Sequence, residues 1–516
     1  MHNFVRILVV SIVSAAALPV YAAKSSLENI EHIVVIYGEN RSFDNLYGLF
    51  PKANGIRNAT HAQFRQIDHD GKVLAILPPV WLEKTRTNEI DPVFIGQDGK
   101  PIKLANQPFR LDQPPFNLSP NKKTRDLVHR FYQNQEQISG GKNNKFAAVS
   151  DAGGLTMGYY DGSSMKLWKL AKQYTLADNF FMGAFGGSYM NHIYLICACV
   201  SEFANPPEGL LSTVNDDRAT LKRVDKSPAS AMDGTPIYVA DKSLTPDGFA
   251  VNTMQPPFQP SGIAPARGGD PRRADPSKCS LDDPRKVEPR MCPLPPQTKK
   301  TVGDTLSEKG VSWAWYSGAW NAAVQDGQQA PDAPRTVIYN DKNGRPNFQA
   351  HHQPFNYFAN YAPGTKAREE HLKDFRELEK DIAAGRLPSV AFYKPQGILN
   401  QHPGYANVMA GDDHIAALVK KIQKGPQWRK TLIIVTYDEN GGFWDHVTSP
   451  SGDRWGPGTR IPTILISPWV QKGFVDHTPY DTSSILKFIT KRFDLTPLEG
   501  VRQNAGDLTA ALVPAK

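Results

Sequence analysis

Apolar residues along this chain alternate between short continuous runs and longer segments with helical periodicity. Runs rich in Val, Ile, Tyr and Trp predict strands at residues 33–37, 311–316, 389–394, 432–436 and 461–466. Good helix formers with apolar positions at helical spacing predict helices at residues 163–174, 366–384, 412–423 and 482–493. The runs at 32–36 and 432–436 are nearly continuous in aliphatic residues, which is typical of central parallel strands covered on both faces. The pattern predicts an α/β fold with a mostly parallel sheet.

The alternation breaks down between about residues 200 and 300, where Pro, Asp and Lys/Arg dominate. Clusters such as Gln255-Pro256-Pro257 and Pro293-Leu294-Pro295-Pro296 exclude long helices, because proline lacks an amide donor and clashes with the preceding turn. We interpret this segment as an irregular insertion or cap. It belongs to a single catalytic domain that we expect to cover residues 23–516.

The first residues have the pattern of a Sec-type signal peptide. Arg6 supplies the positive charge, residues 7–18 form a short apolar stretch, and Val20-Tyr21-Ala22 gives a small-residue cleavage pattern. We therefore expect residues 1–22 to be removed and the protein to be periplasmic or secreted. No later run is long and apolar enough for a transmembrane helix, so we expect no stable membrane anchor.

Charge changes this picture only slightly. The 59 basic and 51 acidic residues give a net charge of +8, which slightly favours anionic substrates or membrane surfaces. The basic residues are scattered, so we expect no nucleic-acid partner. The oligomeric state cannot be read from the sequence.

Four cysteines in an exported chain indicate one or two disulfides. A bridge between Cys279 and Cys292 would restrain a Pro-rich loop with little regular structure. Cys197 and Cys199 follow an apolar run and would point to the same face of a strand, or they could be buried free thiols. A zinc site is disfavoured, since no further ligand stands beside them at the usual spacing.

Oxygen-bearing side chains follow both of the aliphatic runs. Glu39 and Asn40 come after the first run, and Asp438 and Glu439 after the second. Ligands of such sheets bind outside the carboxyl ends of the strands, so the two groups could meet at one edge. A cation would then offset the mutual repulsion of the carboxylates. The alternative is that both groups are N-caps or turn residues.

A glycine-rich run, Gly183-Ala184-Phe185-Gly186-Gly187-Ser188, places a hydroxyl where the backbone can approach a ligand closely. Ser188 could be a nucleophile. An α/β-hydrolase elbow needs glycine two residues after its serine, but Met190 stands there. A serine activated by a metal remains open, and so does a structural role for Ser188 as a cap or turn residue.

Four histidines lie in polar surroundings rich in Gly, Asn and Pro: His129, His351, His352 and His402. Imidazoles can donate hydrogen bonds to phosphate oxygens, and one can act as an acid for a leaving oxygen. A single histidine is more often structural or solvated, so each of them is only a candidate.

Together these motifs resemble the bacterial phosphoesterase family, which contains phospholipases C and an acid phosphatase branch. The resemblance covers nearly the whole mature chain and is carried by the ordered set Glu39 to Asp44, Gly187 to His192, His402-Pro403, Tyr437 to His446, Arg460-Ile461-Pro462 and Ile466 to Trp469. The segments 126–132, 140–142 and 351–357 look particularly like the acid phosphatase branch. The phospholipase C branch typically carries Thr where Ser188 stands and has extra C-terminal domains.

The resemblance implies an alkaline-phosphatase-like α/β/α sandwich and a phosphorylated-enzyme mechanism. One metal would be surrounded by Glu39, Asn40, Ser188, Asp438 and Glu439, with Ser188 as the nucleophile. The phosphoryl group would be contacted by His129, by His351 or His352, and by His402. Oxygen ligands favour Ca²⁺, Mg²⁺ or Mn²⁺ over Zn²⁺.

The leading hypothesis for function is a broad-specificity acid phosphatase that hydrolyses phosphate monoesters through a phosphoserine. A phospholipase C acting on phosphatidylcholine-type diesters is the second hypothesis. The expected substrates are therefore phosphate esters, with phospholipid among the candidates. A non-catalytic exported metal-binding protein is the third hypothesis, and it would bind metal without turnover.

Overall fold

The computed structural model describes residues 26–82, 89–261, 279, 292–330, 333, 335–340 and 346–513. Its centre is an eight-stranded sheet. The strand order is β13 (Phe474–Asp476), β4 (Thr175–Ala177), β12 (Thr463–Ile466), β11 (Thr431–Tyr437), β1 (His32–Gly38), β10 (Val390–Lys394), β8 (Trp313–Ser317) and β9 (Leu372–Asp374). Every neighbouring pair is parallel except the two pairs that β12 makes with β11 and β4.

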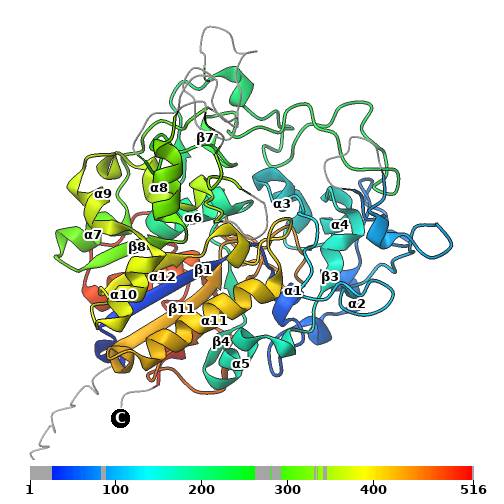
Figure 1. Ribbon diagram of the computed structural model, residues 1–516. Helices are drawn as coiled ribbons and strands as arrows, with labels where there is room; N and C mark the ends of the chain where they lie inside the picture. The colour runs from blue at the N-terminus through cyan, green and yellow to red at the C-terminus, as the bar shows by residue number, and fades with distance from the viewer. Residues whose placement is uncertain are drawn as a thin grey trace, which may run out of the picture.

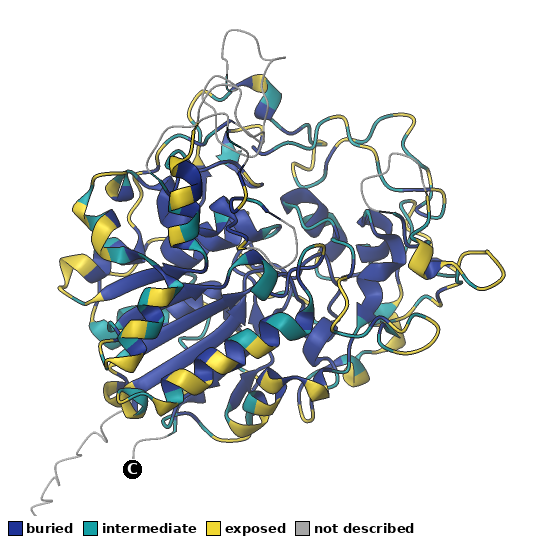
Figure 2. Cartoon of the chain, in the orientation of Figure 1, coloured by how far each residue is buried: buried dark blue, intermediate teal, exposed yellow. Residues whose placement is uncertain are grey.

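Helices cover both faces of this sheet. On the face toward the viewer in Figure 1 lie α10 (Phe375–Ala383) and α11 (Val408–Lys424), and α11 also packs against α5 (Lys166–Gln173). On the other face α6 (Ser188–Cys197) packs against α12 (Thr482–Phe493) and α7 (Val302–Glu308). The central strands are buried, whereas α11 alternates buried and exposed positions along its length (Figure 2). The predicted α/β/α sandwich with a mostly parallel sheet is confirmed.

The remaining elements are short and surround the sheet. The helices are α1 (Phe43–Tyr47), α2 (His61–Phe64), α3 (Phe131–Ile138), α4 (Phe146–Val149), α8 (Trp320–Gln328) and α9 (Lys366–His371). The strands are β2 (Phe109–Arg110), β3 (Gly158–Tyr159), β5 (Phe180–Phe181), β6 (Ser201–Glu202), β7 (Phe249–Ala250) and β14 (Tyr480–Asp481). Among the described residues, no helix is long and apolar enough to cross a membrane.

All five predicted strands are present, and the helix predicted at 482–493 has those bounds in the structure. Asp481 caps its N-terminus by accepting a hydrogen bond from the Ser483 amide, and Asp494 ends it in a left-handed conformation. The helix predicted at 366–384 is instead interrupted by β9, the edge strand of the sheet, which pairs with β8. Sheet pairing outweighs helix propensity there, and Asp374 then starts α10 with a capping box.

The Pro-rich segment contains only β6, the 3-10 helix Glu208–Leu210 and β7 among its described residues, in agreement with an irregular insertion. The predicted bridge between Cys279 and Cys292 is present. The strand placement of Cys197 is wrong, because the glycine-rich run opens the helix α6, which ends at Cys197. Cys197 and Cys199 form a disulfide across this helix end. The predicted signal peptide lies outside the described residues, and the single-domain boundary stays a prediction.

Candidate active site

Three adjacent strands end at the same edge of the sheet and carry the predicted site. Glu39 and Asn40 follow β1, Asp438 and Glu439 follow β11, and Lys394 is the last residue of β10. The strands β1 and β11 stay in register to their ends, where Gly38 pairs with Tyr437. These five side chains are buried. The sheet topology therefore brings residues 400 positions apart into one buried cluster.

The backbone joins the two acidic loops directly. Asn40 adopts a left-handed conformation (φ 57°), and its amide donates to Asp438 Oδ1 at 3.0 Å. The Glu439 amide donates to the same oxygen at 2.8 Å, and the Arg41 amide donates to the Glu439 carbonyl at 3.0 Å. Asp438 Oδ1 thus accepts two backbone hydrogen bonds in a turn, as the turn-residue interpretation expects. The other carboxylate oxygen, Oδ2, takes no part in this turn.

Ser188 is the first residue of α6, and Gly187 is the N-cap, so Ser188 does not cap the helix. Its Oγ donates toward Glu39 Oε2 at 3.2 Å and Asn40 Oδ1 at 3.3 Å. The preceding glycine pair makes this approach possible. A Cβ at Gly187 would lie 2.7 Å from the His129 carbonyl oxygen, and Gly186 has a φ of 89°.

His129 and His402 point their Nε2 atoms at one group, the side-chain amide of Asn40. Asn40 Nδ2 lies 3.4 Å from His129 Nε2 and 3.0 Å from His402 Nε2. The Nδ1 atoms contact the backbone carbonyls of Leu127 and Pro403. Because an amide nitrogen can only donate, both Nε2 atoms act as acceptors here and both protons sit on Nδ1.

His351 and His352 approach from the 3-10 helix Ala350–His352. His352 Nε2 lies 3.1 Å from Glu39 Oε1, and the ring centroids of the two histidines are 4.3 Å apart. His351 Nδ1 contacts the Tyr339 hydroxyl at 3.1 Å. All nine residues predicted for the site therefore lie in one neighbourhood.

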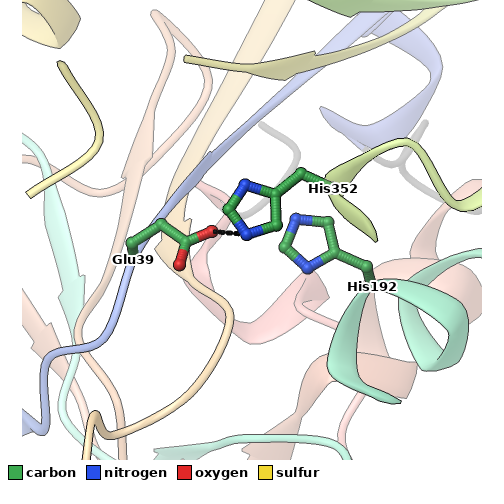
Figure 3. A group of neighbouring side chains, drawn as sticks. All are labelled: Glu39, His192 and His352. Carbon is green, nitrogen blue, oxygen red and sulfur yellow. Dashed lines mark ion pairs between the residues drawn. The ribbon is translucent and has the colours of Figure 1, made fainter. Parts of the chain in front are cut away.

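Two further residues in this cluster are absent from the sequence prediction. Lys394 Nζ contacts Glu39 Oε1 and lies 5.3 Å from the Tyr37 ring centroid. His192 stacks on His352, with ring centroids 4.8 Å apart and an interplanar angle of 5° (Figure 3). Both had a signal in the sequence, since Lys394 ends an apolar strand and His192 stands one helical turn after Ser188.

Burial shifts the pKa values of the carboxyl and imidazole groups in this cluster. Desolvation is the main cause that raises the pKa of Glu39 to about 8, and the charge of Asp438 is the second. Lys394 opposes the shift. Desolvation and Asp438 also raise the pKa of Glu439 well above its usual range. Burial lowers the pKa of His351 to about 3 and that of His402 well below its ordinary value. Ionised carboxylates in this place need additional positive charge.

The donor set fits a divalent cation. Asp438 Oδ2 and Glu439 Oε1 are buried without a hydrogen-bond partner among the described residues. With the oxygens of Glu39, Asn40 and Ser188, they offer the carboxylate, amide and hydroxyl ligands that hard cations prefer. Three groups of described side chains place their ligand atoms within 4.8 Å of one another. They are Glu39 with His192 and His352, Asp126 with His129 and His402, and Asp44 with Asp445 and His446. Of the predicted carboxylate ligands, only Glu39 belongs to one of these described groups.

The third group is an ionic cluster that holds the two acidic loops together. Arg460 Nε donates to Asp445 Oδ1 at 3.0 Å, and its Nη2 donates to Asp44 Oδ1 at 3.2 Å. His446 Nδ1 lies 2.6 Å from Asp44 Oδ2, and its Nε2 contacts Asn54 Oδ1 at 3.1 Å. These contacts already satisfy the cluster, so its role is structural.

Comparisons with known proteins find similarity to phospholipases C and to an alkaline phosphatase superfamily protein. Phospholipase C B of Mycobacterium tuberculosis is 23% identical over 510 residues, which cover 90% of this chain and 74% of the relative. Non-specific phospholipase C6 of Arabidopsis thaliana is 34% identical over 151 residues, which cover 23% of this chain and 29% of the relative. A solved alkaline phosphatase superfamily protein from Vibrio parahaemolyticus is 9% identical and covers 78% of this chain and 76% of its own, but its TM-score of 0.30 is too low to support an inference.

A sequence model of the phosphoesterase family matches residues 30–496, a span that includes every residue of the cluster. The chain therefore belongs to the phosphoesterase family and is a phosphoric ester hydrolase.

Proposed function

We propose that this protein is a metal-dependent acid phosphatase that hydrolyses phosphate monoesters of broad structure through a phosphoserine at Ser188. The observation that carries the proposal is the position of Ser188 Oγ, which faces Glu39 and Asn40, while the rings of His129 and His402 face the same Asn40 amide. A monoester dianion offers three non-bridging oxygens. A ring of imidazoles together with one cation can bind all three.

In this proposal Glu39, Asn40, Asp438, Glu439 and Ser188 would hold one divalent cation. When bound, the cation supplies Lewis-acid stabilisation of the negative charge on the nucleophile and the phosphoryl oxygens. Its ligand chemistry fits Ca²⁺, Mg²⁺ or Mn²⁺ better than Zn²⁺.

The chain's own residues do the rest. Ser188 Oγ forms a bond to phosphorus as the bond from phosphorus to the ester oxygen breaks, and Glu39 Oε2, at 3.2 Å, is placed to accept the serine proton. The departing alkoxide takes up a proton from water and leaves as the alcohol. His129 and His402 would contact the phosphoryl group, since their Nε2 atoms both face the Asn40 side chain beside Ser188. Their Nδ1 protons remain bound to the backbone carbonyls, so the rings keep their orientation. Water then hydrolyses the phosphoserine and releases phosphate.

A second candidate function is that of a phospholipase C, because the curated relatives named above carry that name. A diester replaces one non-bridging oxygen with a carbon-bearing one, and a lipid needs an apolar pocket. We therefore compare kcat/KM of the purified protein on an aryl phosphate, the matching choline diester and phosphatidylcholine vesicles, each with and without chelator. The proposal predicts at least about a tenfold preference for the monoester, equal to roughly 1.4 kcal/mol of transition-state stabilisation. Equal or better use of the diester would favour phospholipase C, and metal binding without turnover would favour the non-catalytic alternative.

Export of the protein stays part of the proposal. It rests on the N-terminal sequence pattern and is checked by finding the mature N-terminus after residue 22 in the periplasm or medium.

A further inference from the structure

A second set of metal-type ligands lies beside the proposed cation site. Glu39, His192 and His352 place one ligand atom each within 4.8 Å of one another, and all three side chains are buried (Figure 3). His192 Nε2 has no hydrogen-bond partner among the described residues. Two imidazoles and one carboxylate form a set that binds Zn²⁺ and similar ions. Glu39 would bridge this set and the oxygen-rich one.

A cation of the chain already contacts this set. Lys394 Nζ touches Glu39 Oε1, the carboxylate oxygen that also faces His352 Nε2. The Lys394 side chain is only 2% exposed, and its ammonium group also lies 3.4 Å from the Gly38 carbonyl oxygen. Because Lys394 is fixed to the end of β10, this positive charge cannot diffuse away.

The charge balance of the whole cluster leaves room for one divalent ion. The carboxylates of Glu39, Asp438 and Glu439 carry three negative charges when ionised, and Lys394 contributes one positive charge. One divalent cation brings the sum to zero. A second one would leave two uncompensated positive charges in a buried site, next to an ammonium group.

We propose that Lys394 takes the place of a second metal ion, so that the active site binds one divalent cation through oxygen ligands and excludes a second, imidazole-bound cation. This inference rests on the proposed function for the identity of the first site. It predicts that the second site is latent and is opened by removing the ammonium group. Lys394 is thus a determinant of metal number and metal type.

The test is metal binding by the full-length mature protein. Wild type, Lys394→Met and Lys394→Arg are dialysed against buffered Zn²⁺, and bound zinc is measured by inductively coupled plasma mass spectrometry. Lys394→Met keeps most of the side-chain length and removes its charge, so it should bind one equivalent more than wild type. Lys394→Arg keeps the charge and should match wild type. The double variant Lys394→Met/His192→Ala should lose the added equivalent.

Cobalt gives a second readout that does not depend on catalysis. Co²⁺ bound to imidazoles at low coordination number absorbs strongly in the visible range, whereas oxygen-bound six-coordinate Co²⁺ absorbs weakly. We expect strong absorption only in Lys394→Met. Folded Lys394→Met with the same zinc content as wild type would overturn the inference, and so would a second zinc ion in wild type.

The difference in bound zinc between Lys394→Met and wild type tests this inference separately from the proposed function. Wild type without any bound metal would contradict the proposed function, while the increment in Lys394→Met would still test the role of Lys394. If Lys394→Met does not fold, His192→Ala in the wild-type background decides. The inference predicts unchanged metal content there, because His192 does not bind the first ion, and a lost equivalent would overturn it.

Discussion

Arg460 provides a measurable test of how the acidic loops are held in place. Its guanidinium group is fully buried and donates to Asp445, Asp44 and the carbonyl oxygens of Asn54 and Asp178, the last two at 2.7 Å. It also lies 4.2 Å from the Phe43 ring centroid. Arg460→Met keeps most of the side-chain volume and removes the charge, which leaves two buried carboxylates without this partner.

Removal of one partner from a buried ion pair costs about 3–5 kcal/mol. His446 still compensates Asp44, because its Nδ1 lies 2.6 Å from that carboxylate, so we expect a loss near the middle of this range, about 4 kcal/mol. Adding about 1.5–3 kcal/mol for each charged hydrogen bond would overestimate the loss, since the freed carboxylate can take up a proton. Burial already raises the pKa of Asp445 to about 6, so the loss should be smaller at acidic pH than at basic pH.

The assay is urea unfolding with an unchanged m-value as the control for two-state behaviour. Arg454→Met is the matched variant, because Arg454 makes a bidentate pair with Asp247 and both side chains are about half exposed. Such a surface pair contributes at most about 1 kcal/mol. The reasoning is refuted if Arg460→Met destabilises the protein no more than Arg454→Met does.

Three further predictions concern the same loops. Asp438→Ala should leave the purified protein with sub-stoichiometric metal, because it removes a charged ligand, and full occupancy by plasma mass spectrometry would make Asp438 a turn residue only. Gly187→Ala should lower both kcat and the unfolding free energy, because the new Cβ would lie 2.7 Å from the His129 backbone carbonyl oxygen and force the backbone beside Ser188 to shift. An unaltered kcat would argue against tight positioning. Burial lowers the pKa of His446, but Asp44 raises it more, so the net shift is upward from 6.5. The stabilisation from this pair is therefore complete below about pH 6.5 and is lost as the pH rises through the raised pKa. His446→Gln should therefore cost more stability in acid than in base, and a pH-independent loss would contradict this sign.

The sequence predicted the sheet well because its strands are buried on both faces and read as nearly continuous apolar runs. The carboxyl ends of these runs located Glu39 and Asp438, since parallel strands present their ends at one edge. Hydrophobic periodicity predicted the wrong element where tertiary contacts determine the local structure. Pairing with β8 ends the helix predicted at 366–384 early, and the apolar run before Cys197 is part of the buried helix α6 and not of a strand.

Lys394 and His192 were missed for a different reason. A lysine at a strand end is usually solvated, and a histidine in an apolar helix is usually a packed core residue. Their significance depends on which strands are neighbours, and local sequence does not give strand order. Only the placement of β10 beside β1 puts the ammonium group on Glu39.

The most direct test of the account is whether Ser188 becomes phosphorylated during turnover. Wild-type protein is mixed with an aryl phosphate, quenched in acid and digested, and the peptides are analysed by mass spectrometry. The account predicts phosphate on the peptide that contains Ser188, and it predicts a folded Ser188→Ala variant whose turnover falls by several orders of magnitude. An unmodified Ser188 peptide together with near-normal turnover by Ser188→Ala would contradict it.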